Sequence, residues 1–527
     1  MVTRVTPRAV NPGRLNHLSL TGEGLQNISA IWTSFPAELA TSPRFTNGAA
    51  QIDLLVPHDV PAGVGAVRVA SSSGASLFFL IAIDDLPAAS TSGSSHSAAA
   101  AVKLQPPIVV DAQCAELSSD FYRFHARGGE RFSIEVVAQR IGSALDPVLR
   151  VLDQRGKELA AVDDAPGAGE DPRFVFKAPQ EGGFSIEIRD INYEGGANSF
   201  YRLRVGKFPL IETTFPLGLR AGTTRAIELI GPAIENLSPM VVRAPTGEGP
   251  VALPVKFPEQ LGSSSLRLGL TRENEITESE PNDAADRANP ISWPAVIDGR
   301  FERAGDRDRF AFQAEKGQRI RINGDTRKFG SLCDLYFRVE KPDGTVVAEP
   351  TEKDIENQTL SAAISETGTY QLLVEELNRR GASNFVYRVE LGASQPGFVL
   401  LAETNLLTMP AAGTMHLKIL ATRQDYDGPI ELKLAGLPDG FSITNTIIPA
   451  KKNETDLQAR IPPTAQAGQL ITFTVVGETV GRDKSFSARA QTRPALQKNF
   501  PRLREPPPEL DGIITLVTAE PKPQKKK

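Results

Sequence analysis

TESEPNDAADRANPISWPAVIDGRFERAGDRDRFAF, residues 277–312, is the stretch from which the fold of this chain is best interpreted. Six side chains with oxygen ligands stand in it, four in the opening acidic run and two just before an alternating, strand-like segment. Carboxylates at this density repel one another unless a cation or solvent screens them, and Ca²⁺ takes six to eight oxygen ligands in a flexible shell. From the residues alone a solvated acidic linker is the favoured interpretation, because runs of charge are usually solvated, and a calcium site is the alternative. The six residues are Glu278, Glu280, Asn282, Asp283, Asp306 and Asp308.

An internal repeat surrounds this stretch. Asp120 to Val151 aligns without a gap on Asp308 to Val339, 188 positions later, so that DFYRFHARGGERF matches DRFAFQAEKGQRI. In the second copy Leu335, Phe337 and Val339 alternate with Tyr336, Arg338 and Glu340, as a half-buried strand requires. We therefore expect the first three side chains to point into a sandwich core and the other three to point outward.

The two copies differ at the predicted metal site. The acidic run of the second copy aligns with Thr91 to His96, TSGSSH, in the first copy, and Ser118 stands where the second copy has Asp306. Of the carboxylates, the first copy keeps Asp120. We expect no metal there.

The order of motifs in the second copy resembles the bacterial pre-peptidase C-terminal domain, a β-sandwich attached to secreted peptidases and other exported proteins. In calcium-binding members of that family, an acidic N-terminal linker and a D-x-D pair hold the metal. The resemblance implies that the six oxygen-bearing residues named above are the ligands here. It rests on E-x-E-P-N-D, an Ala-Asn pair, a Gly, G-D-x-D-x-F, L-x-D-L-x-F and E-T-G-T-Y, at Glu278–Asp283, Ala288-Asn289, Gly299, Gly305–Phe310, Leu332–Phe337 and Glu366–Tyr370.

A second repeat precedes each copy. GRLNHLSLTGEGLQN, from Gly13 to Asn27, aligns on GTTRAIELIGPAIEN, from Gly222 to Asn236, with alternating apolar positions such as Leu18 and Leu20. This pattern resembles IPT/TIG immunoglobulin-like domains. A different alternating pattern between about Gln395 and Thr492 predicts a further Ig-like sandwich.

These patterns predict an all-β chain of tandem β-sandwiches, Ig-like and jelly-roll-like, arranged as beads on a string. The predicted order is a TIG-like sandwich (1–86), a Ser/Ala-rich linker (87–105), a pre-peptidase-like sandwich (106–206), a shortened TIG-like sandwich (207–274), a second pre-peptidase-like sandwich (275–392), an Ig-like sandwich (393–492) and a largely disordered tail (493–527). We expect disorder in the tail because it offers little apolar area to bury, although residues 513–517 form a short apolar run that could pair as an added strand.

Composition supports this class. The 527 residues include 44 Gly and 40 Pro, the density of many short strands joined by turns, and a net charge near -5 gives no nucleic-acid footprint. Two cysteines, Cys114 and Cys333, stand at non-equivalent positions of the two copies and predict unpaired, buried thiols. No apolar window is long enough for a transmembrane segment.

No zinc spacing, nucleophile elbow or P-loop occurs in the sequence. We therefore expect a non-enzymatic binding or spacer protein whose ligand is a protein or polysaccharide at the cell surface. The alternatives are the accessory region of a secreted peptidase system and a purely architectural envelope component. MVTRVTPRAVNPG, the start of the sequence, has no apolar signal region, which taken literally indicates the cytoplasm; the resemblance to exported modules instead favours a cell-surface, extracellular or periplasmic location and a trimmed or mis-assigned start.

Overall fold

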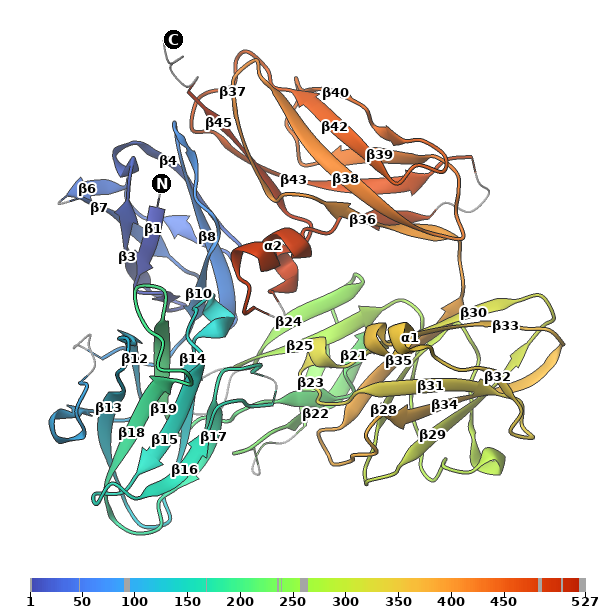
Figure 1. Ribbon diagram of the computed structural model, residues 1–527, viewed down its shortest axis with the longest axis horizontal. Helices are drawn as coiled ribbons and strands as arrows, with labels where there is room; N and C mark the ends of the chain where they lie inside the picture. Colours follow the sequence, from blue (N-terminus) through green and yellow to red (C-terminus); the bar gives the residue numbers. More distant parts are fainter. Residues whose placement is uncertain are drawn as a thin grey trace.

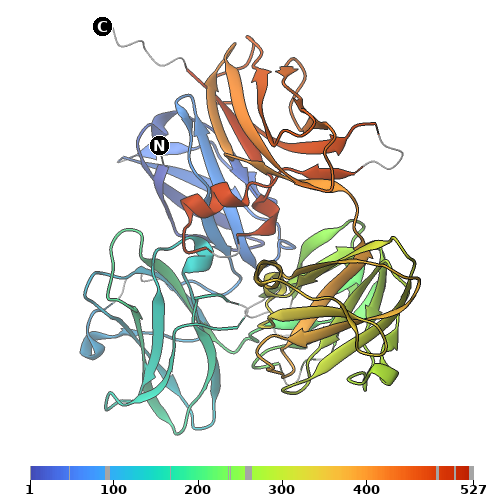
Figure 2. The ribbon, with the colours of Figure 1, turned by 45° about the vertical axis from the view of Figure 1, so that its right-hand side comes forward.

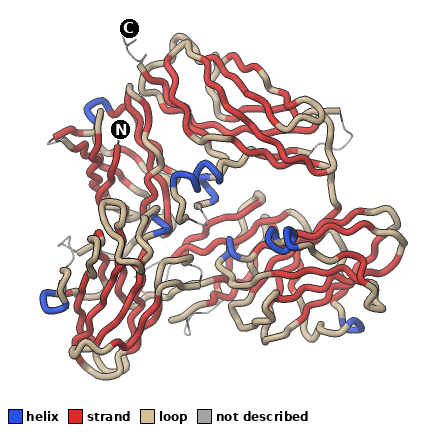
Figure 3. The backbone as a smooth tube through the Cα atoms, in the orientation of Figure 1, coloured by secondary structure: helices blue, strands red, loops and turns tan. Residues whose placement is uncertain are grey.

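The computed structural model describes residues 2–46, 48–89, 95–166, 168–234, 237, 239–255, 264–481, 486–503 and 506–520. Within these ranges the strands, drawn in Figures 1 and 3, form ten sheets. Five large apolar cores lie between pairs of sheets. The predicted fold class, all-β with tandem sandwiches, is confirmed. No helix in the described part of the chain combines the length and apolar character needed to cross a membrane.

The first sandwich consists of β1 (Val2–Thr6), β2 (Ala9–Val10), β3 (Leu15–Gly22), the 3-10 helix η1 (Leu25–Asn27), β4 (Ile28–Thr33), β5 (Glu38–Leu39), β6 (Arg44–Thr46), β7 (Ala49–Leu55), β8 (Gly63–Ser71), β9 (Gly74–Ala75) and β10 (Phe79–Ile83). One sheet has the order β1-β3-β7-β5 and the other β2-β10-β8-β4, with β6 beside β7 and β9 beside β8. Leu18 and Leu20 on β3 are fully buried between them, as their alternation predicts.

The second sandwich consists of η2 (Ala98–Ala100), β11 (Val102–Lys103), β12 (Ile108–Gln113), β13 (Asp120–Ala126), β14 (Arg131–Val137), η3 (Gln139–Ile141), β15 (Pro147–Leu152), β16 (Glu158–Val162), β17 (Arg173–Lys177), β18 (Gly182–Asp190) and β19 (Phe200–Gly206). Its sheets have the orders β11-β13-β18-β15-β16 and β12-β19-β14-β17.

The fourth sandwich consists of β26 (Asn274–Thr277), η4 (Ala285–Arg287), β27 (Asn289–Pro290), β28 (Ala295–Arg300), β29 (Arg307–Ala314), β30 (Arg319–Asp325), η5 (Arg327–Phe329), β31 (Leu335–Glu340), β32 (Val346–Ala348), α1 (Glu352–Asn357), β33 (Thr359–Ala363), β34 (Gly368–Glu376) and β35 (Val386–Ala393). Its sheets, β27-β29-β34-β31-β32 and β26-β28-β35-β30-β33, repeat the strand order of the second sandwich with β26 added at one edge. β26 is the strand that leads into the acidic run.

The strand phase predicted for β31 is confirmed at five of its six positions. Leu335, Phe337 and Val339 are at most 2% exposed, and Tyr336 and Arg338 are half-buried. Glu340, expected to point to solvent, is instead 2% exposed, because Arg309 and Arg338 pair with its carboxylate at 2.7 and 2.5 Å.

The third sandwich is small, as the shortened repeat predicts. It has two three-stranded sheets, β20-β22-β23 and β21-β25-β24. Its strands are β20 (Thr213–Phe215), β21 (Gly218–Arg220), β22 (Thr224–Ile230), β23 (Met240–Arg243), β24 (Gly249–Val255) and β25 (Ser264–Thr271).

The fifth sandwich consists of β36 (Gly397–Ala402), β37 (Leu406–Pro410), β38 (Thr414–Gln424), β39 (Ile430–Ala435), β40 (Ser442–Thr444), β41 (Ile447–Ile448), β42 (Glu454–Arg460), β43 (Leu470–Thr479), β44 (Ser487–Arg489) and, from the C-terminal segment, α2 (Arg493–Asn499), η6 (Pro508–Leu510) and β45 (Ile514–Ala519). β45 lies between β37 and β43 inside a sheet of order β37-β45-β43-β39-β41, which also carries β44, while the other sheet has the order β36-β38-β42-β40.

The expectation of a largely disordered tail over 493–527 is therefore wrong for residues 493–503 and 506–520. Leu496 on α2 and Leu510 are at most 1% exposed, packed with Leu80 of the first sandwich and Ile141 of the second. The tail is ordered because these other sandwiches supply the apolar surface that its own composition lacks.

The five sandwiches do not form the open string that was expected. The first and fifth sandwiches meet, and Figures 1 and 2 show α2 in the middle of the assembly beside the first sandwich. Ser29 Oγ donates to the Gly468 carbonyl at 2.7 Å, and the fully buried Arg68 donates to the Asn405 carbonyl at 3.1 Å and to Thr515 Oγ1 at 2.5 Å. The chain is closed because its C-terminal segment returns to the sandwich where it began.

Part of the Ser/Ala-rich linker expected at 87–105 lies outside the described residues, namely 90–94. The described flanks are paired with the second sandwich. Ala88 forms a bridge with Val109, Ser95 with Phe121, and β11 adds in parallel to β13. Cys114 and Cys333 are free and buried, as predicted.

Candidate metal centre

The acidic cluster, defined as Glu278, Glu280, Asn282, Asp283, Asp306 and Asp308, lies where β26 leaves the sheet and β29 begins. β26 pairs in parallel with β28, and the Glu278 amide donates to the Asp298 carbonyl at 3.0 Å, which extends the pairing by one residue. The run then turns back. Asn289 fixes this turn, because its side chain accepts from the Ser279 amide and donates to the Ser279 carbonyl, both at 2.8 Å.

The two ends of the cluster meet through backbone and side-chain contacts. Asp283 Oδ1 accepts from the Arg307 amide at 3.2 Å, and its carbonyl accepts from Arg309 Nε at 3.1 Å. The linker thus folds back against the loop at Asp306 to Asp308, as binding of one ion by both parts requires.

Tyr387 on β35 joins two of the carboxyl groups in the interior. Its hydroxyl lies 2.7 Å from Asp308 Oδ2 and 3.0 Å from Glu278 Oε2. Burial, and then the charge of Glu278, raise the pKa of Asp308 well above its usual range, and burial raises the pKa of Glu278 to about 7. Without a cation, the folded state therefore favours a bound proton on the pair of carboxyl groups formed by Glu278 and Asp308.

Four oxygens of the cluster are buried without a hydrogen-bond partner: Glu280 Oε1, Asn282 Oδ1, Asp306 Oδ1 and Asp308 Oδ1. Such an atom costs roughly 1–3 kcal/mol when nothing replaces its water. Four unpartnered acceptors from four predicted ligands form the donor set that a hard cation would satisfy.

An exposed guanidinium lies against the same cluster. Arg303 pairs with Asp283 Oδ2, and its Nη2 lies 3.2 Å from Asp306 Oδ1, within ion-pair distance but without hydrogen-bond geometry. Burial, and then the charges of Asp306 and Asp283, raise the pKa of Glu280. The guanidinium of Arg303 thus already places one positive charge against the carboxylates of this cluster.

Across the described ranges, no group of three or more His, Cys, Asp or Glu side chains is arranged to hold a metal ion. In the acidic cluster one unpartnered oxygen belongs to an amide, and Arg303 stands against two carboxylates. Arg303 is 57% exposed, so its guanidinium can move into solvent and be replaced by a cation at these carboxylates.

The second sandwich provides the contrasting site. Asp120 Oδ2 accepts from the Tyr201 hydroxyl at 2.7 Å, as Asp308 accepts from Tyr387, but the second partner of Tyr201 is the Tyr122 hydroxyl at 2.6 Å rather than a carboxylate. His96 Nδ1 stands 3.1 Å from Asp120 Oδ1. In the second sandwich the neighbours of this Tyr-Asp contact are thus a phenol and an imidazole, whereas in the fourth sandwich they are carboxylates. Thr91 to Ser94 lie outside the described residues.

The sequence predicts the six cluster residues as ligands, and the structure places two further side chains, Tyr387 and Arg303, beside them. Tyr387 is fully buried, and its hydroxyl lies within hydrogen-bond distance of two predicted ligands, Asp308 and Glu278. Arg303 was not singled out, although its position three residues before Asp306 was a visible signal.

No family model matches the chain. A probable subtilase-type serine protease of Deinococcus radiodurans is 36% identical over 74 residues, 14% of this chain and 10% of that protein, so the chain spans about a tenth of the length of this relative. The pre-peptidase C-terminal domain of a Bacillus anthracis collagenase is similar over 20% of this chain and 93% of that domain, at 15% identity and a TM-score of 0.16. A Clostridium perfringens structure with an M60 catalytic domain and two CBM51 domains is also similar, at 11% identity and a TM-score of 0.15. The match covers 68% of this chain and 42% of the Clostridium perfringens chain.

Proposed function

We propose that this chain is a non-catalytic, exported binding and spacer protein whose fourth sandwich is stabilised by one calcium ion. The observation that carries the proposal is the set of four buried, unpartnered oxygens at the joint between the acidic run and β29. A bound Ca²⁺ would neutralise the carboxylates and supply the missing partner of each oxygen.

The chain's own residues connect this site to the joint between the third and fourth sandwiches. Arg388 pairs with Glu275 on β26 at 3.1 Å and with Asp298 on β28 at 2.8 Å. Its guanidinium lies so close to Gly218 and Gly269 of the third sandwich that a Cβ at Gly218 would come within 2.2 Å of it. A ligand that fixes the end of β26 would therefore also fix the orientation of the third sandwich, which suits a spacer.

The expected stabilisation is modest. Extracellular calcium modules commonly have dissociation constants of roughly 10⁻⁴ to 10⁻³ M. At about 1 mM Ca²⁺ and a dissociation constant near 0.1 mM, mass action adds about 1.4 kcal/mol to the free energy of unfolding. The ion would shift the melting temperature by a few degrees without being required for folding.

Thermal unfolding of the full chain tests this proposal. The transition of the fourth sandwich should occur a few degrees higher in millimolar Ca²⁺ than in chelator. Glu280→Ala combined with Asp308→Ala should remove the difference. If calcium does not change the melting temperature of the wild type, the acidic cluster is a solvated linker and does not bind the ion.

A second candidate is the accessory region of a secreted peptidase system. The 74-residue match to a probable subtilase-type serine protease favours it. The genomic sequence upstream of Met1 tests it, because a peptidase domain in the same reading frame would support this candidate and a signal peptide directly before Met1 would support the first.

A further inference from the structure

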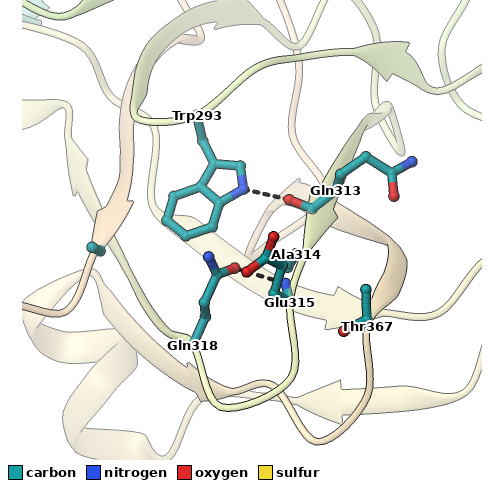
Figure 4. A pocket seen from close by; sticks show the side chains of 7 residues that line it. Trp293, Gln313, Ala314, Glu315, Gln318 and Thr367 are labelled. Carbon is teal, nitrogen blue, oxygen red and sulfur yellow. Dashed lines mark hydrogen bonds between the residues drawn. The ribbon is translucent and has the colours of Figure 1, made fainter.

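The end of the fourth sandwich opposite the acidic cluster carries an open depression of about 530 Å³, here called the Trp293 pocket (Figure 4). Trp293 stands in the turn between β27 and β28, and Thr367 precedes β34. Gln313 and Ala314 end β29, and Glu315 and Gln318 lie in the turn that leads from β29 to β30 in the other sheet. β29 begins at the acidic cluster and ends here. A strand rise of about 3.3 Å per residue therefore puts the pocket roughly 20 Å from the cluster.

Trp293 is held as a fixed wall of the pocket. Its Nε1 donates to the Gln313 carbonyl at 2.6 Å, and its ring meets Phe312 edge to face at 6.4 Å. The indole is half-buried, and its single polar atom is already bonded. What it can offer a ligand is therefore aromatic surface.

The polar groups beside the ring combine donors and acceptors. Gln318 Oε1 accepts from the Glu315 amide at 2.7 Å, which leaves its Nε2 as a donor, and in Figure 4 the amide points toward the indole. Thr367 Oγ1 accepts from the Lys316 amide at 3.0 Å and keeps its hydroxyl proton to donate. Within the described ranges no side chain pairs with the Glu315 carboxylate, which remains an acceptor.

The composition of this lining discriminates between ligand classes. Neither Lys nor Arg lines the pocket, so an anion finds no counter-charge, and the single carboxylate is too little for a multivalent cation. Apart from Trp293, only the small side chains of Ala314 and Ala393 are apolar, which is too little surface for a lipid or a hydrophobic cofactor.

We propose that the Trp293 pocket binds a neutral polysaccharide, one of whose sugar rings lies against the indole while its hydroxyl groups bond to Gln318, Thr367 and Glu315. A pyranose ring has an apolar face that suits an aromatic ring and a hydroxyl rim that both donates and accepts. The pocket is an open depression rather than an enclosed hole, which suits an inner segment of a chain. This inference rests on the proposed function as a binding protein and names its ligand class.

The second sandwich has different side chains at the aligned positions, and no tryptophan among them. Pro106 stands where the fourth sandwich has Trp293, His125 stands for Gln313, Arg127 for Glu315 and Glu130 for Gln318. The pocket is thus specific to one copy of the repeat, and the other copy serves as an internal reference within the same molecule.

The test is binding of the full chain to four soluble neutral polysaccharides: a β-glucan, a xylan, a mannan and an α-glucan. A proline-rich peptide is tested beside them as the alternative ligand for an exposed aromatic ring. The chain has two tryptophans, so Trp32→Phe leaves Trp293 as the single fluorescent reporter. We expect at least one polysaccharide to shift the Trp293 emission. Trp293→Ala should weaken its binding roughly tenfold or more, judged by affinity electrophoresis or calorimetry.

A second variant keeps the test decisive if Trp293→Ala disturbs folding. Glu315→Ala with Gln318→Ala removes two side chains outside the core and should weaken binding by a similar factor, whereas Trp32→Phe should leave it unchanged. No binding to any polysaccharide at millimolar sugar, binding that survives both pocket variants, or a response to the peptide alone would each overturn the inference. The calcium response of the same variants should stay intact, so failure here is separable from failure of the proposed function.

Discussion

Replacing Asp308 by Asn should stabilise the calcium-free chain and remove its response to calcium. The Tyr387 hydroxyl lies 2.7 Å from Asp308 Oδ2 and 3.0 Å from Glu278 Oε2, so these carboxylate oxygens are at most 5.7 Å apart, the sum of the two distances. Two unit charges at that separation repel by roughly 3 kcal/mol at an effective dielectric constant of about 20. Asn keeps an acceptor for Tyr387 and removes the repulsion.

The size of this effect depends on pH. Burial raises the pKa of Glu278 to about 7, so the folded state binds the proton more tightly than the unfolded state, whose pKa is near 4.5. Stability from this group is complete below pH 4.5 and is lost as the pH rises through about 7. The gain from Asp308→Asn in chelator should therefore grow as the pH rises through about 7, reach about 3 kcal/mol or more once both carboxyl groups are ionised, and shrink toward pH 6.

Denaturant unfolding followed by the emission of Trp293 in a Trp32→Phe background measures this effect in the full chain. Asp120→Asn is the matched control, because Asp120 holds the same tyrosine contact in the second sandwich without a second carboxylate. The reasoning would be refuted if Asp308→Asn lowered stability in chelator by more than 1 kcal/mol, or if the variant still responded to calcium.

Three further predictions follow from the packing. Phe337→Ala should cost about 3–5 kcal/mol by loss of burial and the cavity left behind, and Tyr336→Ala much less; equal losses in equilibrium unfolding would mean that the phase of β31 is wrong. Burial favours the neutral acid at Glu135, but Arg140, Arg204 and Arg173 lower its pKa to about 2, so its contribution should be complete above about pH 4.5 and be lost as the pH falls toward 2. An acid-unfolding limb that Glu135→Gln leaves unchanged would contradict this. Leu496→Asp should detach α2 from the first and second sandwiches and enlarge the molecule in small-angle scattering, whereas an unchanged radius of gyration would argue against the packing described for the C-terminal segment.

The sequence predicted what depends on local alternation. Leu18, Leu20, Leu335 and Phe337 are buried because a period of two places them on the inner face of a strand, whatever the strand pairs with. Glu340 is buried although the alternation predicts that it points outward, because guanidinium groups pair with its carboxylate. One of them, Arg309, comes from a strand two positions away in the sheet. Such pairing is not visible in the spacing of one strand.

The metal candidates were predicted for a similar reason. Glu278 to Asp283 and Asp306 to Asp308 are two short runs whose residue types are themselves the signal. The contact between them, in which Asp283 accepts from the Arg307 amide, became visible only in the structure. Closure of the chain was not predictable in this way. Leu496 and Leu510 stand in a polar, Pro-rich segment, and their burial depends on Leu80 and Ile141, which are hundreds of residues away.

The most direct test of the calcium proposal is isothermal titration of the full chain with Ca²⁺ at pH 7.5. We predict one site with a dissociation constant of roughly 10⁻⁴ to 10⁻³ M. The heat should disappear in the Glu280→Ala, Asp308→Ala double variant and persist in Asp120→Asn. Absence of binding at millimolar calcium, or binding that the double variant retains, would contradict the proposal that the acidic cluster is a metal centre.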